Sequence, residues 1–244
     1  FSFIPNTAEV AFYGLVKGCE DYLNKIKIDR IQSWNGNVDP EKLAEMINRK
    51  IRMEKIAIKD VKMRTFITED ASRHEMVQHV YDITYGTVRK DVDTLVVIDD
   101  SIVRGTTLKE SIIRMLARLQ PKRIIVVSSS PQIRYPDCYG IDMSKMGDFI
   151  AFNAAVELHK ERGTEGLLKE LYEECKCLLE KDELHTVNVA KQVYKAFTNE
   201  EITKKIAELI TPPDLEIPVD VIFQTIETLH MACPNNLGDW YFTG

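Results

Sequence analysis

The sequence lacks the features that would place the chain in a membrane, in a disulfide-bonded fold or on nucleic acid. No apolar run among its 244 residues approaches the roughly 20 that a membrane-spanning helix needs, and no signal peptide is visible. The five cysteines are an odd number without the spacing of a disulfide framework, so we expect free thiols and a reducing, cytoplasmic compartment. The net charge of −6 offers no general basic surface for nucleic acid.

Two common phosphate-binding motifs are missing as well. In the polar loop that follows residue 98, no Gly-Lys pair completes a P-loop, and a single glycine stands where a dinucleotide fingerprint needs three. Cys175 and Cys177 form a C-x-C pair, but no further residues stand at zinc-binding spacing around them. The five histidines need no role in catalysis and are expected at the surface or in packing.

The chain does contain a strand, a loop, a helix and a second strand in close succession. Residues 94–98 and 123–128 are nearly continuous apolar runs, as expected for strands that are covered on both faces. Between them, a Thr-Leu-Lys-Glu capping box that begins at Thr107 predicts an amphipathic helix to Leu119. This order predicts a right-handed βαβ unit in a parallel sheet, and therefore an α/β fold.

Caps and apolar spacing predict the other elements. Residues 1–5 resemble a core strand, and because a chain seldom opens inside such a strand, we expect a segment to precede it. Helices are predicted from a cap at Asn6 or Thr7 to about Gly18, from Pro40 to about residue 50, and over residues 72–85, 164–180, 199–210 and 219–230. The chain thus divides into a core, residues 1–150, and a mainly helical region, residues 151–244, that packs on it.

Two adjacent carboxylates follow the first apolar strand, in the run V-V-I-D-D-S-I-V-R-G-T-T that begins at Val96. Asp99 and Asp100 would lie at the C-terminal end of a parallel strand, where such sheets bind ligands. Carboxylates accept hydrogen bonds from ribose hydroxyls and supply the hard oxygen ligands that Mg²⁺ prefers. This half of the loop predicts a diol together with a metal ion.

The second half of the loop suits a phosphate. Gly105 permits a close backbone approach or a positive φ, Arg104 supplies positive charge, and Thr106 and Thr107 supply hydroxyl donors. A helix begins at once, and its N-terminal amides and dipole favour an anion. The whole loop therefore predicts a phosphorylated ribose as the ligand. The alternative is an ordinary polar turn with a solvated acidic pair.

The run D-D-S-I-V-R-G-T-T, which begins at Asp99, resembles the phosphoribosyl pyrophosphate signature of type I phosphoribosyltransferases, and in its full form that of amidophosphoribosyltransferases. Further strings similar to that family stand at residues 5–7, 64–67, 129–136, 139–143 and 242–244. The resemblance implies a type I phosphoribosyltransferase fold and a dependence on Mg²⁺. It implies the first step of purine synthesis, in which phosphoribosyl pyrophosphate and ammonia give 5-phosphoribosylamine and pyrophosphate.

The resemblance also implies roles for individual residues. Asp99 and Asp100 would bind the ribose hydroxyls and Mg²⁺. Arg64 would act from a loop that closes over the ligand and excludes water. The other expected ligand contacts are Arg104, Gly105, Thr106 and Thr107 around the 5′-phosphate, and Asn6, Thr7 and Ala8 on the pyrophosphate side. Ser101 is a further expected substrate contact.

The chain departs from the family at three places. The glutaminase half, with its N-terminal cysteine nucleophile, is expected to be absent from this chain, which would then use free ammonia or ammonia from a separate glutaminase domain. Asn6 stands where the family usually has an acidic residue, and Ala8 where it often has serine. Tyr241 stands where some members have a cluster-binding cysteine, so we expect no iron–sulfur cluster.

Three alternatives stay open. A non-catalytic regulator of the same fold would bind phosphoribosyl pyrophosphate, but it would be expected to carry a DNA-binding element and a basic face. A salvage transferase would need a hood that binds a free base. A catalytically weakened relative is compatible with the altered segment from Asn6 to Ala8. By resemblance, we expect a homo-oligomer that purine nucleotides inhibit, with neither nucleic acid nor a membrane as a partner.

Overall fold

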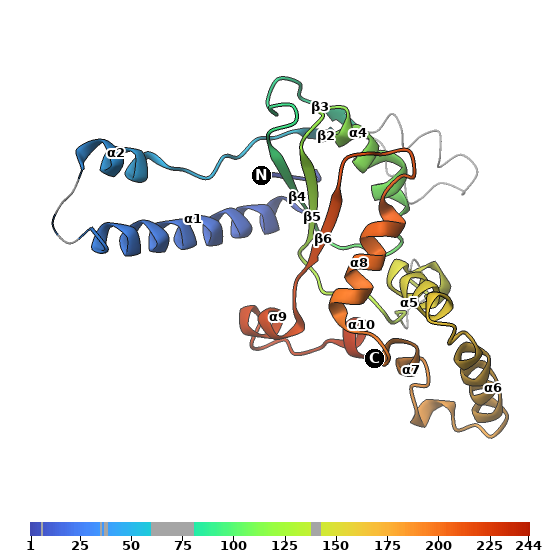
Figure 1. Ribbon diagram of the computed structural model, residues 1–244. Coiled ribbons are helices and arrows are strands. Elements are labelled where there is room, and N and C mark those ends of the chain that lie inside the picture. Colours follow the sequence, from blue (N-terminus) through green and yellow to red (C-terminus); the bar gives the residue numbers. More distant parts are fainter. Residues whose placement is uncertain (6, 35, 37–38, 60–80, 138–142) are drawn as a thin grey trace.

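The computed structural model describes residues 1–5, 7–34, 36, 39–59, 81–137 and 143–244. Its centre is a four-stranded sheet in the order β1 (Ser2–Phe3), β4 (Thr94–Asp99), β5 (Arg123–Ser128) and β6 (Val219–Phe223) (Figure 1). Every neighbouring pair is parallel, so the C-terminal ends of all four strands share one edge. Helices flank this sheet, which confirms the predicted α/β class with a parallel sheet.

One face of the sheet carries the larger core. Val97, Val126 and Val221 are in register on β4, β5 and β6, so their side chains share a face, and all three are buried. They belong to the same apolar cluster as residues of α8 (Asn199–Ile210) and of α5 (Ile150–Glu161), which packs on α8. Burying a side chain of this size stabilises the fold by about 1.5–3 kcal/mol relative to leaving it exposed.

The opposite face is covered by α1 (Glu9–Gln32). Phe3 of β1 and Ile98 of β4 are in register and form a second cluster with Phe12 and Val16 of α1. The ring centroids of Phe3 and Phe12 lie 4.9 Å apart. This contact fixes where the first strand and the first helix meet.

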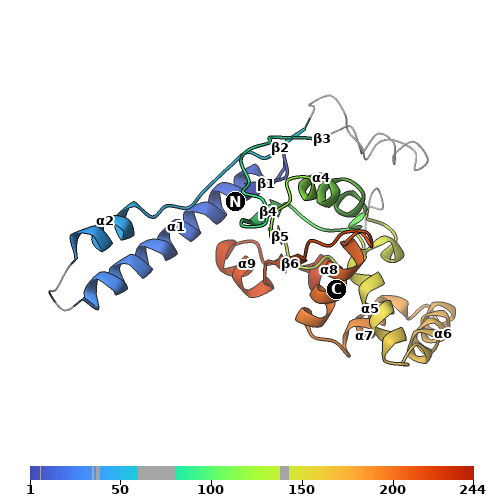
Figure 2. The same cartoon turned by 45° about the horizontal axis from the view of Figure 1, so that its top comes forward.

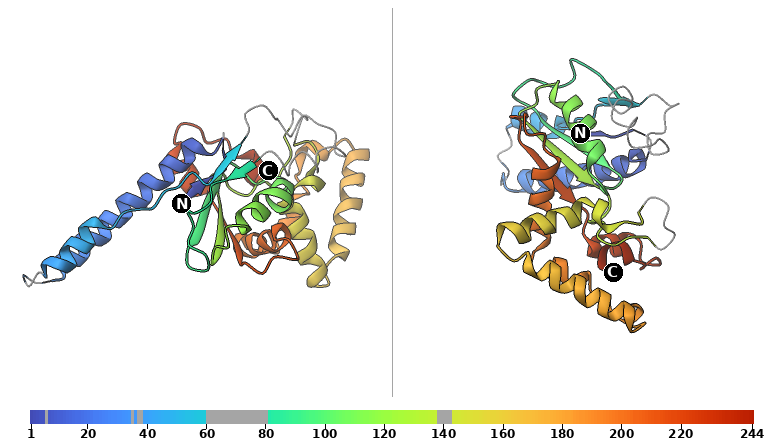
Figure 3. Two further views of the ribbon diagram at one scale, coloured as in Figure 1. Left: turned by 90° about the horizontal axis from the view of Figure 1, so that it is seen from above. Right: turned by 90° about the vertical axis from the view of Figure 1, so that its right-hand side faces the viewer.

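α1 extends far beyond the sheet, so its predicted end near Gly18 is wrong. A glycine inside a helix costs only about 1 kcal/mol relative to alanine, and the helix continues through it. The second half of α1 lies beside α2 (Pro40–Asn48) in an arm that projects from the body of the molecule (Figures 2 and 3). Lys27 Nζ donates to the Ile47 carbonyl at 3.1 Å and links the two helices.

Side-chain N-caps begin two of the predicted helices. Asp39 accepts a hydrogen bond from the Glu41 N–H at 3.0 Å at the start of α2. At the start of α8, Thr198 Oγ1 accepts from the Glu201 N–H at 3.1 Å, while Glu201 accepts from the Thr198 N–H at 2.8 Å. The N-cap of α1 is Ala8, without a side-chain bond, so Thr7 does not cap this helix.

The capping box predicted at Thr107 is wrong. The segment between β4 and β5 is helical as expected, through η2 (Leu108–Ile112) and α4 (Ile113–Ala117). However, Thr107 already has helical dihedral angles, φ −60° and ψ −39°, and its side chain makes no cap bond. The Gly105 carbonyl accepts from the Lys109 N–H at 3.0 Å, so the helix begins before Thr107 and its hydroxyl is not used in capping.

The region after residue 150 is mainly helical, as predicted, but it also supplies a strand. A short helix, η3 (Met146–Asp148), precedes this region. Its elements besides α5 and α8 are the helices α6 (Gly166–Glu180), η4 (Leu184–Thr186), α7 (Lys191–Tyr194), α9 (Ile226–Ala232) and α10 (Trp240–Thr243). The helix predicted over residues 219–230 is wrong in its first half, which forms β6. The run V-D-V-I-F is rich in β-branched and aromatic residues, and these fit a pleated surface.

A small antiparallel pair stands beside the main sheet, formed by β2 (Ala57–Lys59) and β3 (Tyr81–Ile83). The helix predicted over residues 72–85 is therefore wrong at its end, because cross-strand pairing with β2 overrides the helical spacing there. Residues 72–80 of that prediction lie outside the described residues. Within the described ranges, no helix combines the length and the apolar character needed to cross a membrane.

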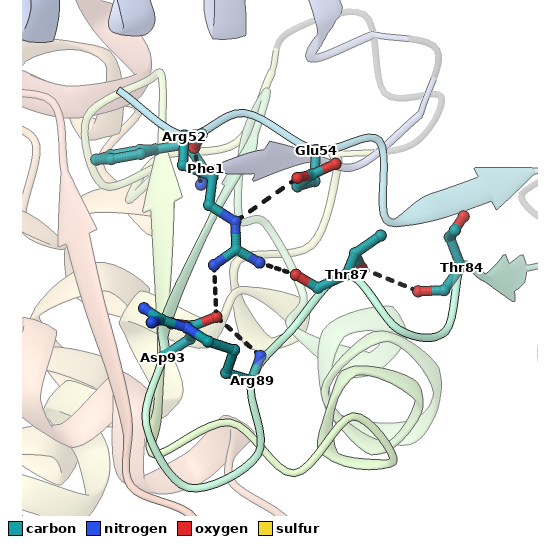
Figure 4. A network of polar contacts seen from close by, with 7 residues as sticks. All are labelled: Phe1, Arg52, Glu54, Thr84, Thr87, Arg89 and Asp93. Carbon is teal, nitrogen blue, oxygen red and sulfur yellow. Dashed lines mark hydrogen bonds and ion pairs between the residues drawn. The ribbon is translucent and has the colours of Figure 1, made fainter. Parts of the chain in front are cut away.

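A cluster of charges joins the segment before β2 to the turn before β4 (Figure 4). Asp93 accepts hydrogen bonds from Arg52 Nη1 at 2.8 Å and from Arg89 Nη2 at 2.7 Å. The Arg89 side chain and backbone amide, followed by Arg52, hold the pKa of Asp93 well below its usual range. Arg52 also lies 3.6 Å from Glu54. These contacts anchor the N-terminal end of β4.

Candidate functional site

The predicted acidic pair lies where β4 ends, between the ends of β1 and β5. Asp99 is the last residue of β4, and both carboxylic residues are half-buried. The Asp100 N–H donates to Asp99 Oδ1 at 2.9 Å, which orients the first carboxylate toward the loop. Because β4 is an interior strand of a parallel sheet, this end lies at the position where such sheets bind ligands.

Ser129 holds the backbone of the acidic pair and was not among the predicted site residues. Its N–H donates to the Asp99 carbonyl at 3.0 Å, and its Oγ donates to the Asp100 carbonyl at 3.0 Å. The residue directly follows β5, so two adjacent parallel strands fix the acidic turn together. A serine directly after an apolar strand was the available signal, although the sequence could not show which loop it contacts.

Gly105 has the positive φ that the sequence suggested, +73°. A Cβ added at this position would lie 3.0 Å from Ile210 Cγ2 of α8 and 3.3 Å from two side-chain carbons of Ile150 at the start of α5. Glycine is thus required here for both the backbone conformation and the close packing. The helical region after residue 149 directly shapes the turn of the loop.

Two further contacts join this loop to the start of α5. The Ile150 N–H donates to the Val103 carbonyl at 2.7 Å. Arg104 Nη2 lies 3.9 Å from Asp148 Oδ2, and the Arg104 side chain is 33% exposed, so its charge still reaches the solvent beside the loop. Asp148, Ile150 and Ile210 carried no sequence signal, because only the folded chain brings them to the loop.

The second half of the loop leads directly into a helix. Thr106 is exposed and Thr107 is half-buried, and both already belong to the helical segment. The first amide groups of a helix have no partner within the helix and carry partial positive charge. Ser101 is half-buried between the acidic pair and this helix start. One loop therefore presents carboxylates at its beginning, and hydroxyls with helix N-terminal amides at its end.

The loop after β1 lies beside the acidic pair, since the Ile4 N–H donates to the Ile98 carbonyl at 2.9 Å. Thr7 is exposed in this loop. The Ala8 side chain is fully buried in the cluster with Phe3 and Phe12, so it can offer a ligand only backbone atoms. Asn6 and the predicted Arg64 segment lie outside the described residues.

The donor set of the loop fits Mg²⁺ held jointly by protein and substrate. No group of three or more histidine, cysteine, aspartate or glutamate residues is placed to hold a metal ion in the part of the chain that the structure describes. Asp99 and Asp100 supply two carboxylates on adjacent residues. Mg²⁺ is commonly bound by one or two carboxylates together with substrate phosphates and water.

No family model matches the chain. Segments of it are similar to curated amidophosphoribosyltransferases. The Haemophilus influenzae protein is 37% identical over 118 residues, 48% of this chain and 23% of that protein. The Escherichia coli protein is 41% identical over 75 residues, 30% of this chain and 15% of that protein. The Saccharomyces cerevisiae protein is 41% identical over 63 residues, 26% of this chain and 12% of that protein.

The matched part of the chain spans less than a quarter of the length of these relatives. Among solved structures, the chain is similar to a glutamine phosphoribosylpyrophosphate amidotransferase from B. subtilis complexed with ADP and GMP. The TM-score is 0.41 and the identity 24%, over 82% of this chain and 32% of that one. The resemblance of the sequence to amidophosphoribosyltransferases is confirmed by the curated relatives.

Proposed function

We propose that this chain is the phosphoribosyltransferase half of an amidophosphoribosyltransferase. It would form 5-phosphoribosylamine and pyrophosphate from phosphoribosyl pyrophosphate and ammonia, the first step of purine synthesis. The proposal rests on one observation above all: a single loop at the end of an interior parallel strand joins an acidic pair to a helix start through Gly105, at φ +73°. In an intact enzyme, a glutaminase domain would supply the ammonia from glutamine.

The two halves of the loop would hold the two ends of the ribose phosphate. Asp99 and Asp100 would accept hydrogen bonds from the ribose hydroxyls, with their backbone fixed by Ser129. The 5′-phosphate would lie over the amides of Gly105, Thr106 and Thr107, where the helix dipole favours negative charge. Arg104 and Ser101 would add a charge and a hydroxyl at the same end.

The reaction requires that charge be stabilised while water is excluded. As pyrophosphate leaves C1, the ribose carbon gains positive character, and the carboxylates of Asp99 and Asp100 would stabilise it electrostatically. Mg²⁺, held by the same carboxylates and the substrate, would offset the charge that develops on the pyrophosphate. Asn6 and Thr7 would contact the pyrophosphate, and Arg64 would close over the ligand, which would protect the activated sugar from hydrolysis.

We extend the proposal to the setting of the enzyme. It would be a cytoplasmic homo-oligomer with purine nucleotides as feedback inhibitors, and residues 1–150 would form the transferase core on which residues 151–244 pack. A second candidate is a non-catalytic protein of the same fold that only binds phosphoribosyl pyrophosphate. The fully buried Ala8 favours it, because this position offers no hydroxyl to the pyrophosphate side.

The first test is calorimetric titration of phosphoribosyl pyrophosphate with Mg²⁺ into the chain and into the Asp99→Asn/Asp100→Asn double variant. We expect the parent to bind and the double variant to lose binding. Asp214→Asn, which removes an exposed carboxylate paired with Arg114, is the matched control and should bind like the parent. Equal binding by all three proteins would place the ligand elsewhere and contradict the proposal.

A second assay separates the enzyme from the non-catalytic alternative. Release of pyrophosphate is followed with ammonia as the nucleophile, in the presence of saturating phosphoribosyl pyrophosphate and Mg²⁺. Ammonia-dependent release identifies a transferase, whereas tight binding without release identifies a binding protein. If the parent binds nothing, the titration is repeated with a glutaminase half joined to the chain. Binding that then returns shows that a glutaminase half orders the site.

A further inference from the structure

β6 is an edge strand whose open side faces a groove. Among the described strands it pairs only with β5, and α8 lies beside it (Figure 1). Open edges present rows of unpaired backbone groups, which other chains can use for strand pairing, and proteins usually shorten, charge or cover them. A segment that binds in the groove could therefore pair with the backbone of β6.

The hydrogen-bond register shows which backbone groups of β6 are open. The Ile124 N–H donates to the Pro218 carbonyl at 2.9 Å, and the Gln224 N–H donates to the Ser128 carbonyl at 3.1 Å. In a parallel pair, alternate residues of a strand bond to the same neighbour. The even-numbered residues of β6 therefore bond to β5. Val219, Val221 and Phe223 direct their N–H and C=O groups to the open side.

The groove runs along this open side and has a volume of about 1020 Å³. All residues from Val219 to Ile226 line it, and α8 and the segment after it form the other wall. Apolar residues contribute to its lining, among them Ala207, Pro212 and Ile222. Ile222 is 52% exposed, which is unusual for an apolar residue of a parallel strand. Neither Asp99, Asp100 nor the loop 101–107 lines the groove, so it is separate from the candidate site.

A cation stands in the groove beyond the C-terminal end of β5. Arg134 Nη2 donates to Gln132 Oε1 and to Asn199 Oδ1, both at 2.6 Å, and its guanidinium lies 5.0 Å over the Tyr194 ring. In the described part of the chain, the side-chain hydrogen bonds of Arg134 go to the neutral amides of Gln132 and Asn199, and burial lowers the pKa of its guanidinium. A half-buried cation whose hydrogen-bond partners are neutral amides favours an anionic ligand group.

The other charges of the groove leave this preference in place. Its acidic residues Glu208 and Asp220 pair with Lys205 and Arg123, respectively, whereas Glu200 is exposed to solvent. Two further cations line the groove, Lys204 on α8 and Lys109 on η2.

We propose that this groove binds an extended peptide segment of another protein, which adds a strand to the open edge of β6 and pairs an acidic residue with Arg134. Main-chain bonds to Val219, Val221 and Phe223 would hold the segment, and its alternate apolar side chains would enter the groove. This is the mode in which sheet edges recognise extended peptides.

The test uses a phage-displayed library of random nine-residue peptides, selected on the full chain. We expect the enriched peptides to alternate apolar residues and to share an acidic residue at a fixed position. The best peptide is then synthesised with a fluorescent label, and its Kd is measured by anisotropy. Arg134→Gln should raise that Kd about 10- to 100-fold, as expected for a lost charge-assisted hydrogen bond. Lys204→Gln should raise it about 2- to 5-fold.

Arg30→Gln, on the projecting part of α1, is the matched control and should leave the Kd unchanged. N-methylation of the peptide, one residue at a time, reports strand pairing directly. Binding should weaken at every second residue and stay near the parent value at the residues between them. This alternation distinguishes backbone pairing from loose apolar contact, and it does not depend on whether Arg134→Gln folds, which thermal melting checks separately.

Three results would overturn the proposal. One is a selection that enriches no acidic, alternating pattern. Another is a Kd that Arg134→Gln and Arg30→Gln leave equally unchanged, with no alternation in the N-methyl series. The third is a chain that sediments as a dimer, becomes a monomer with Ile222→Lys and selects no peptide. That last result would assign the edge to a second copy of this chain.

Discussion

The loop after β4 and the helical region after residue 149 contribute to the same site in different ways. The loop carries the candidate ligand-binding groups, which are visible as a string of nine residues from Asp99. The helical region carries no recognisable motif, yet Ile150 and Ile210 surround Gly105 and fix the turn of that loop. The comparison teaches that the residues which bind and the residues which shape the site can lie a hundred positions apart.

Two identical cap signatures sharpen this comparison. Thr107 and Thr198 each precede a glutamate by three residues, the spacing of a capping box. At Thr198, both reciprocal bonds form. At Thr107, neither the dihedral angles nor the side chain fit a cap, because the turn at Gly105 starts the helix earlier. Local sequence is decisive where the helix start is exposed, and tertiary packing is decisive where the start is pressed against α5 and α8.

The largest predicted effect comes from removing the side chain that packs on the loop. Ile210→Ala should lower the free energy of unfolding by about 2–5 kcal/mol, because Ile210 is fully buried. It should also weaken binding of phosphoribosyl pyrophosphate, since the turn at Gly105 loses its support. Ile206→Ala, equally buried on the same helix, is the control. Urea unfolding and calorimetry should show similar stability losses and a larger affinity loss for Ile210→Ala.

Gly105→Ala tests the loop side of the same contact. A positive φ and a Cβ contact at 3.0 Å both oppose alanine, and together they should cost roughly 2–4 kcal/mol in urea unfolding. Gly14→Ala, in α1 with nothing near its added Cβ, should instead stabilise by about 0.5–1 kcal/mol. In the double variant Gly105→Ala/Ile210→Ala, the smaller side chain makes room for the added methyl. The double variant should therefore lose less unfolding free energy than the sum of the losses in the two single variants. A loss equal to that sum would argue against the contact.

The two cap signatures predict a smaller and unequal pair of effects. Thr198→Ala should lower the free energy of unfolding by about 1 kcal/mol, since it removes the Oγ1 that accepts the hydrogen bond from the Glu201 N–H. Thr107→Ala should change it by less than about 0.5 kcal/mol. Chemical unfolding of both variants under one set of conditions makes this check. Equal losses would mean that Thr107 caps its helix after all.

The smallest effect concerns Asp93, which pairs with arginines just before β4, at the opposite end of that strand from Asp99. The pKa of Asp93 is lowered in the folded chain, so its stabilising contribution is present above its unfolded value, near 4. That contribution is lost as the pH falls toward the folded value. The stability difference between the parent and Asp93→Asn should therefore shrink as the pH is lowered from about 5 to about 2. A difference that does not change with pH would show that the pairing contributes nothing, as many exposed ion pairs do.

Much of the fold follows from local pattern. The apolar runs that became β4 and β5, the helix between them, the start of α2 and the capped start of α8 were all predictable, because each depends on neighbours within a few residues. The errors have tertiary causes. The run from Val219 to Phe223 became a strand because the edge of β5 was available for pairing. α1 passed through Gly18 because nothing packs there to end it.

By itself, the sequence determined the chemical groups of the candidate site and their order: two carboxylates, a glycine, two threonines and a helix start. Their spacing along the chain is short enough that they must lie together in any fold that forms the strand. Only the tertiary structure decided how that loop is held, by Ser129 just after β5 and by Ile150 and Ile210 from the helical region. These are contacts between residues distant in sequence, and they exist only once the sheet and its helices have packed.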